Sequence, residues 1–178
     1  MHDARRDAEL VEAASRGDVD AFETLYRRHR DWVVRLARRF TRNEHDALDV
    51  LQDTFAYLLR KLPRLRLTAR MTTFLYPVVK HLSLDASRLR RRHAPSIAVP
   101  DAAAPDEPRT DRGELAAVLG ALPEPQRETV LMRYVDGMSL AEIAEALDVP
   151  LGTVKSRLHN AMRVLRDDPR TRRYFLEG

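Results

Sequence analysis

The residues best suited to binding chemistry lie in the segment SLAEIAEALDVPLGTVKSRLHNAMRVLR, at 139–166. Over 153–166, apolar side chains recur at helical spacing on one side, and hydrogen-bond donors fill the opposite side. A helix in the major groove of DNA needs such a dry side against its own domain, with donors facing base edges and phosphates. The candidate DNA contacts are Thr153, Lys155, Ser156, Arg157, His159, Asn160 and Arg163.

Position along this predicted helix separates base readers from phosphate contacts. Residues near the N-terminus of a recognition helix usually reach bases, which favours Lys155, Ser156 and His159 as readers. Arg163 and Arg166 are better placed for phosphates. Arg157 lies near the edge of the dry side, so an ion pair within its own domain is as good an interpretation as a phosphate contact.

The residues that precede this helix favour a helix-turn-helix over a solvated amphipathic helix, although the stripe alone fits both. Ser139 and Glu142 have the spacing of a capping box, which predicts a helix start at this point. A short turn with Pro150 and Gly152 then separates two helical patterns. Two short helices joined by a tight turn are typical of this DNA-binding motif.

A second group of residues combines positive charge with aromatic rings. Residues 1–93 hold 20 basic and 13 acidic side chains, a net charge of +7, whereas 94–113 and 114–178 have net charges of −2 and −1. Aromatic rings in a basic groove suit unpaired nucleic-acid bases, which stack on them. The alternative is that the aromatic residues belong to the core and the arginines only solubilise the protein. The candidates are Arg64, Arg66, Arg70, Phe74, Tyr76, Lys80, His81, Arg88 and Arg91.

A third group is acidic and lies on the helix predicted over 43–62. Asp49, Gln52 and Asp53 fall on one side of it, away from the leucine stripe. An acidic patch on a basic domain is unfavourable for DNA and suits a basic protein partner. A solvated helix face is an equally good interpretation of the spacing.

Several functional classes are excluded by what the sequence lacks. It contains no cysteine, which excludes disulfides and thiolate metal sites and fits a reducing cytoplasm. It has no apolar run long enough for membrane insertion, and its beginning does not resemble a signal peptide. No phosphate-binding glycine loop, HExxH or GxSxG motif occurs, and the histidines show no ligand spacing. We therefore expect a cytoplasmic protein that is not an enzyme and needs no metal or cofactor.

The elements that position these groups are all predicted to be helices, which gives an all-α protein. A proline-rich flexible linker at 94–113 separates a helical domain at 1–93 from a helix-turn-helix domain at 114–178. Apolar stripes place Leu48, Leu89 and His29 toward the core, His29 in the core or at its boundary. The predicted helices are 4–15, 18–41, 43–62, 73–92, 114–122, 124–135, 139–148 and 153–167.

The chain resembles the extracytoplasmic function (ECF) sigma factors of bacteria. The segments GDVDAFETLYRRHRDWVVRLARRF, DALDVLQDTFAYLLRKL and TTFLYPVVKHLSLDASRLRRR are similar to their region 2. The segment LPEPQRETVLMRYVDGMSLAEIAEALDVPLGTVKSRLHNAMRVLR is similar to their region 4. The resemblance covers about 15–92 and 114–166.

This resemblance implies a function in promoter recognition. It implies that Asp49, Gln52 and Asp53 dock on the clamp helices of the β′ subunit of core RNA polymerase, with further contact to the β subunit. The basic and aromatic group would capture unpaired bases of the −10 element of promoter DNA, and the 153–166 helix would read the −35 element. An inhibitory anti-sigma partner is also implied.

Two departures from the family pattern affect the predicted helix at 73–92. Phe74 stands where tryptophan is usual, and Pro77 stands where arginine is usual. Because proline lacks an amide hydrogen and clashes with the preceding turn, we expect this helix to begin late, near Phe74, or to kink.

A second functional hypothesis, independent of polymerase, is an autonomous dimeric helix-turn-helix regulator. A stable dimer indifferent to core polymerase would favour it.

Overall fold

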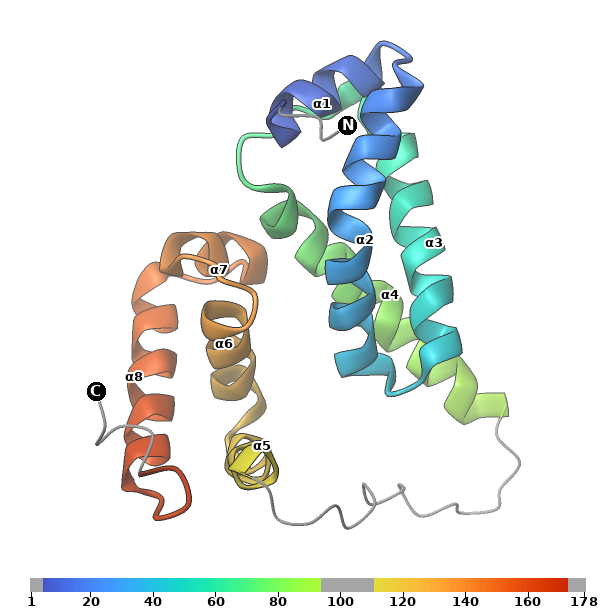
Figure 1. The fold of residues 1–178 in the computed structure, drawn as a ribbon. Coiled ribbons are helices and arrows are strands. Elements are labelled where there is room, and N and C mark those ends of the chain that lie inside the picture. The colour runs from blue at the N-terminus through green and yellow to red at the C-terminus, as the bar shows by residue number, and fades with distance from the viewer. Residues whose placement is uncertain (1–4, 94–110, 173–178) are drawn as a thin grey trace. The chain divides into compact units, whose positions relative to one another are not determined.

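The structure is a computed structural model that describes residues 5–93 and 111–172. The predicted all-α class is confirmed, because the described residues form eight α-helices and a short 3-10 helix, and contain no strand. The chain divides into two compact units, Met1–Pro95 and Ser96–Gly178 (Figure 1). The predicted linker lies outside the described residues except at 111–113, which form the start of a helix.

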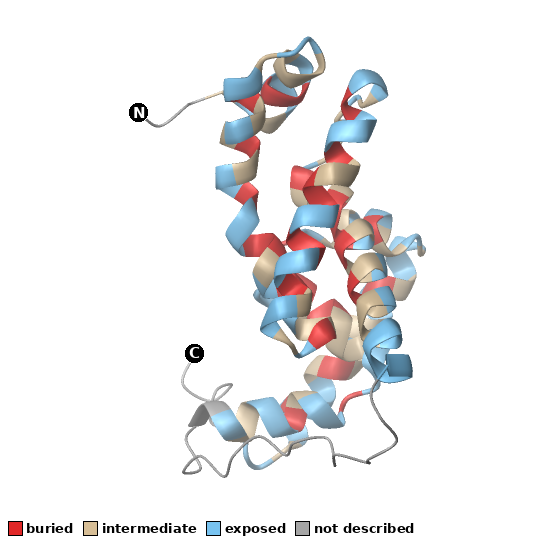
Figure 2. Ribbon diagram, turned by 90° about the vertical axis from the view of Figure 1, so that its right-hand side faces the viewer, coloured by how far each residue is buried: buried red, intermediate tan, exposed pale blue. Residues whose placement is uncertain are grey.

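The first unit contains α1 (Asp7–Ser15), α2 (Val19–Thr41), α3 (Glu44–Lys61), the 3-10 helix η1 (Leu62–Arg64) and α4 (Met71–His93). α2 and α3 form an antiparallel pair, α4 packs across both, and α1 lies over one end (Figure 1). Buried residues follow the facing sides of these helices, with exposed residues on the outer sides (Figure 2). The unit is therefore a helical bundle with one apolar core.

Two helices of this unit begin directly after residues whose side chains cap them. The Asp18 side chain accepts a hydrogen bond from the Ala21 amide at 2.9 Å, and Asn43 accepts one from the Asp46 amide at 2.9 Å. Each cap satisfies one of the amides that a helix start leaves without an internal partner. Trp32 is 8% exposed, and His29 is buried as predicted.

Three core predictions in this unit are wrong or incomplete. Leu48 and Leu89 were expected to face the core, but they are 42% and 57% exposed. Tyr76 was expected to offer aromatic surface, but it is 1% exposed. Helical spacing gives the side on which a residue lies, but not the point along a helix where its neighbours stop covering it.

The start of α4 also differs from the prediction. α4 begins at Met71 and includes Pro77 in its interior, so the expected late start near Phe74 is wrong. Met71 and Thr73 are buried, which anchors the first turn in the core. Pro77 lies on the exposed side, where its ring does not have to fit between packed helices.

Ion pairs attach α1 to α2. Asp7 accepts a bond from the Arg28 guanidinium at 2.5 Å and lies 2.8 Å from Nε2 of His29. Burial alone would raise the pKa of Asp7, but the hydrogen bonds and charge of His29 and Arg28 outweigh it and lower this pKa below its ordinary value. The Asp7 carboxylate is therefore a stabilising contact as long as it is ionised.

We expect Asp7→Asn to lower the free energy of unfolding at neutral pH by about 1–2 kcal/mol, because a charged hydrogen-bond acceptor is lost. A lowered folded pKa means that the wild-type advantage is present above the ordinary aspartate value and lost as the pH falls through the folded value. Denaturant titrations at a series of pH values test this. An equal acid dependence in wild type and variant would contradict it.

The second unit contains α5 (Asp111–Ala121), α6 (Glu124–Tyr134), α7 (Leu140–Leu147) and α8 (Leu151–Asp167). α8 packs against both α6 and α7, and α5 adds apolar side chains to the same core. The predicted capping box is present at the start of α7, with Ser139 and Glu142 each accepting a bond from the amide of the other. The core residues are Val118, Leu122, Val130, Ala161 and Leu165.

The residues that directly follow α8 cap its C-terminal end. Asp168 accepts hydrogen bonds from the Arg170 side chain and amide, which lower its pKa to about 2. The buried Thr171 hydroxyl donates to the Leu165 carbonyl. These contacts satisfy groups at the helix end that would otherwise have no partner.

Candidate nucleic-acid and protein interfaces

α7 and α8 form the predicted helix-turn-helix. Asp148 ends α7 in a left-handed conformation with φ of 51°, and the Val149 amide bonds back to the Ala144 carbonyl at 3.0 Å. Pro150 follows, and its carbonyl accepts the Thr153 amide at 2.9 Å, so α8 begins at Leu151. The turn fixes the start of α8 against α7.

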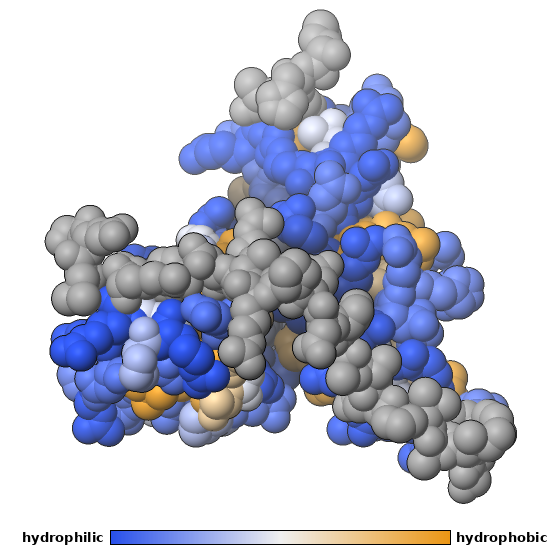
Figure 3. Space-filling model, turned by 60° about the horizontal axis from the view of Figure 1, so that its bottom comes forward, coloured by the Kyte–Doolittle hydropathy of each residue, from blue (hydrophilic) through white to orange (hydrophobic). Residues whose placement is uncertain are grey.

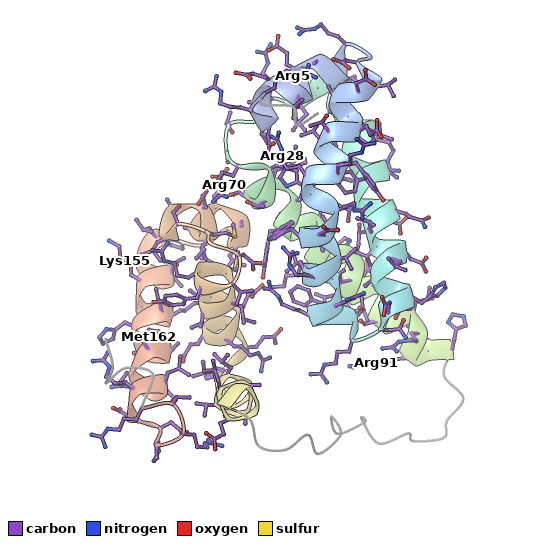
Figure 4. The ribbon with its side chains drawn as sticks, in the orientation of Figure 1. Arg5, Arg28, Arg70, Arg91, Lys155 and Met162 are labelled. Carbon is purple, nitrogen blue, oxygen red and sulfur yellow. The ribbon has the colours of Figure 1, made fainter. Side chains whose placement is uncertain are left out.

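The two sides of α8 are separated as the sequence predicted. Val154, Ala161 and Leu165 are buried against the unit. The predicted readers Lys155, Ser156 and His159, and also Arg163, are exposed. Lys155 projects from the side of α8 turned away from α6 (Figure 4). This side offers donors over several helical turns, as a DNA-reading helix requires.

The remaining predicted contact residues of α8 differ in their burial and in their hydrogen bonds and ion pairs. Thr153, Arg157 and Asn160 are half-buried. The Ser156 hydroxyl donates to the Thr153 carbonyl at 3.0 Å, which leaves its oxygen as an acceptor. Within the described ranges, Arg157 forms no ion pair, so the predicted alternative of an intradomain pair is not seen there.

The loop before α4 presents three of the predicted arginines. Arg64, Arg66 and Arg70 are exposed on the segment between α3 and α4, and α1 packs against its first turn, η1. Arg70 lies at the start of α4, and Arg91 lies near its far end (Figure 4). At about 1.5 Å per residue, the 23 residues of α4 span about 35 Å, so these residues form a long track instead of a pocket.

Phe74 is half-buried at the start of this track, beside two residues that the sequence analysis missed. Its ring centroid lies 6.4 Å from that of Tyr57, with the planes inclined by 33°. Lys61 places its amine 5.4 Å from the Tyr57 ring centroid. Because α3 and α4 run antiparallel, the end of α3 lies beside the start of α4. This topology could have indicated Tyr57 and Lys61 as neighbours of Phe74.

From Lys80 onward, α4 carries cations in different environments. His81 lies 3.2 Å from Asp85, and Arg88 lies 3.1 Å from the same carboxylate. Lys80 is half-buried, with its amine 6.0 Å from the Phe40 ring centroid. Arg91 is exposed. Asp85, which the sequence analysis did not single out, therefore neutralises part of the predicted basic face.

Arg90 has a structural function that the sequence did not indicate. Its Nε lies 3.1 Å from Asp46 on α3, and its guanidinium donates to the Thr41 carbonyl at the end of α2 at 2.9 Å. Ser87 donates to the neighbouring Phe40 carbonyl at 3.2 Å. These bonds fix the rotation of the last turns of α4 against the α2–α3 turn.

The acidic residues lie on the exposed side of α3. Asp49, Gln52 and Asp53 are all exposed, and Asp49 lies 3.8 Å from His45 one turn earlier. Asp53 has no ion-pair partner within the part of the chain that is described. The three residues thus form a surface with uncompensated negative charge, the acidic face.

Two searches of the described residues were negative. No group of three or more histidine, cysteine or acidic side chains there could hold a metal ion. None of the helices in the same residues is both long and apolar enough to span a membrane.

Comparisons with known proteins relate both units to one class of bacterial proteins. The model of Sigma-70 region 2 matches residues 25–93, and that of Sigma-70, region 4 matches residues 112–165. The ECF RNA polymerase sigma factor SigM of Mycobacterium tuberculosis is 38% identical over 161 residues, covering 88% of this chain and 81% of SigM. SigW of Bacillus subtilis, also named as an ECF sigma factor, is 26% identical over 88% of this chain and 92% of its own.

A solved structure is similar across both units. The structure of CnrH in complex with the cytosolic domain of CnrY has a TM-score of 0.66 and 27% sequence identity, and the match covers 89% of this chain and 93% of that one.

Proposed function

This chain belongs to the ECF RNA polymerase sigma factors, and on that premise we propose how its exposed faces divide the work of promoter recognition. The acidic face of α3 binds the β′ clamp helices of core RNA polymerase, and the β subunit makes further contact. The loop before α4 and α4 itself hold the −10 element, and α8 reads the −35 element. As a transcription initiation factor it performs no catalysis itself, and it acts in the cytoplasm, where polymerase is.

One observation supports this division more than any other. In the first unit the exposed acidic residues lie on α3 and the exposed arginines lie before and on α4, the exposed donors of α8 lie on the second unit, and each unit matches a different sigma region. A single polymerase subunit that must bind a protein and two DNA elements needs separate surfaces of opposite charge. Family membership favours this function over the autonomous dimeric regulator.

Strand opening on this proposal needs no reactive group from the chain. Unpaired bases of the −10 element are held by stacking and polar contacts, which offset an unpairing cost of a few kcal/mol per flipped base. Phe74 is the stacking residue, with Tyr57 behind it. Tyr76 is withdrawn from the proposed DNA contacts because it lies in the core.

We expect Phe74→Ala in the holoenzyme to weaken binding of a single-stranded −10 oligonucleotide by about five- to a hundredfold, since stacking contributes roughly 1–3 kcal/mol per base. Filter binding or fluorescence anisotropy measures this loss. Phe74→Trp keeps an aromatic surface and serves as the matched control, with near wild-type binding. Equal binding by the alanine variant would remove Phe74 from the site.

The overall proposal is tested by run-off transcription with purified core polymerase on genomic fragments. We expect transcripts from a small set of fragments sharing two elements, and only when the chain is added. Transcription that does not depend on the chain would contradict the proposal. We also propose that an anti-sigma protein covers the same faces, as the family resemblance implies; the similar protein CnrH was solved in complex with the cytosolic domain of CnrY.

A further inference from the structure

A groove lies between the acidic face of α3 and the C-terminal half of α4. Its volume is about 530 Å³. Asp49, Val50 and Asp53 line it from α3, and the α4 wall is formed by Leu82, Asp85, Ala86, Arg88, Leu89 and Arg92. The groove therefore begins at residues assigned above to polymerase binding and continues onto a helix assigned to DNA.

The position of Leu89 on this wall is fixed by contacts on the other side of α4. Ser87 and Arg90 bond to the α2–α3 turn. At about 100° per residue, Leu89 is rotated by about 100° from Arg90 and about 200° from Ser87, so it points away from that turn. Leu89 is 57% exposed as a result, a high value for a leucine in a packed helix.

The two walls differ in charge. Asp85 is paired with His81 and Arg88, so its charge is already compensated within α4. On the α3 wall, Asp53 has no ion-pair partner among the described residues, and Asp49 has only the distant His45. The groove thus offers the carboxylates of Asp49 and Asp53 on the α3 side, and on the α4 side an apolar strip of Leu82, Ala86 and Leu89 flanked by Arg88 and Arg92.

This asymmetry defines the chemistry of an occupant. Figure 3 shows hydrophilic residues over much of the surface in view, with patches of apolar residues among them. In the groove, half-buried Leu82 and Ala86 and exposed Leu89 place such apolar surface beside carboxylates. A helix fits it when one edge carries arginine or lysine and the adjoining edge carries leucine, isoleucine or methionine. DNA does not fit, because it would bring phosphates against Asp49 and Asp53.

We propose that the contact with core polymerase extends from the acidic face across this groove onto α4, where Leu89 is an apolar anchor for a basic, amphipathic helix of the polymerase. This inference rests on the function proposed above, and it adds α4 residues to a surface otherwise confined to α3. Leu89 holds the bound helix through apolar burial, and Asp49 and Asp53 supply the electrostatic attraction.

The test measures affinity for core polymerase in the absence of DNA, so that contacts between DNA and the neighbouring arginines do not add to the measured affinity. Leu89→Ala should weaken binding by about tenfold, as expected for an apolar anchor. Leu89→Arg should weaken it further, because a charged group would have to be buried against the apolar edge of the partner. As a control, Val19→Ala truncates a side chain that is 76% exposed at the start of α2, the end opposite to the α2–α3 turn. This variant should leave the affinity unchanged.

Salt dependence separates the apolar contact from the charged one. The loss in Leu89→Ala should persist at high salt, whereas the loss in Asp53→Asn should shrink, because salt screens exposed charges. Circular dichroism checks that each variant is folded. Wild-type affinity in both Leu89 variants, with binding still abolished by Asp53→Arg, would overturn the inference and leave the proposed function intact. Failure of the wild-type chain to bind core polymerase would instead overturn the proposed function.

Discussion

Asp53→Arg is expected to weaken binding to core RNA polymerase by at least about a hundredfold while the fold stays intact. The substitution replaces an attractive charge with a repulsive one against a basic partner, and like charges at an interface cost several kcal/mol. Because Asp53 is exposed and has no ion-pair partner within the described residues, its loss breaks no ion pair among them. Fluorescence anisotropy with labelled chain and titrated core enzyme measures the affinity.

The matched control for this charge reversal is Asp31→Arg. Asp31 is also exposed, but it lies on α2, and its ion-pair partner among the described residues is the adjacent Arg30 at 3.2 Å. The control variant should bind core polymerase as wild type does. If Asp53→Arg also bound normally and supported transcription, the acidic face would have no part in polymerase binding.

Lys155→Ala is expected to lower holoenzyme binding to the preferred −35 sequence by about five- to a hundredfold, with little change on unrelated sequences. A well-placed side chain at a base edge contributes roughly 1–3 kcal/mol of discrimination. Lys155 is exposed in the second turn of α8, where such contacts are made. Competition binding with promoter fragments recovered from run-off transcription measures the ratio.

Arg166→Ala provides the contrast for Lys155. Arg166 is exposed in the last turn of α8, which favours a phosphate contact. Its loss should weaken binding on all sequences alike and reduce the slope of log affinity against log salt by about 0.9. If Lys155→Ala showed this uniform pattern instead, Lys155 would be a phosphate contact and not a base reader.

Features decided by neighbouring residues were predictable from the sequence. Asp18, Asn43 and Ser139 cap helices because each needs only an amide two or three positions along the chain. The division of α8 into a buried and an exposed side follows from helical spacing alone. These features required no knowledge of how the helices pack.

Features decided by packing were not predictable in the same way. Leu89 and Leu48 continue apolar stripes but are exposed, because no other helix covers them there. Tyr76 is buried and Phe74 only half-buried, although both belong to the same aromatic cluster in the sequence. The bond from Arg90 to Thr41 joins residues 49 positions apart, and nothing in the local sequence distinguishes Arg90 from the arginines beside it.

The burial of Trp32 makes one half of the chain visible on its own to optical spectroscopy. Trp32 is 8% exposed in the first unit, and it is the only tryptophan in the sequence. Indole emission is sensitive to the polarity around the ring, so its shift on denaturation follows the first unit and leaves the second silent. Ellipticity, by contrast, sums the helices of both units, so the difference between the two signals isolates the melting of the second unit.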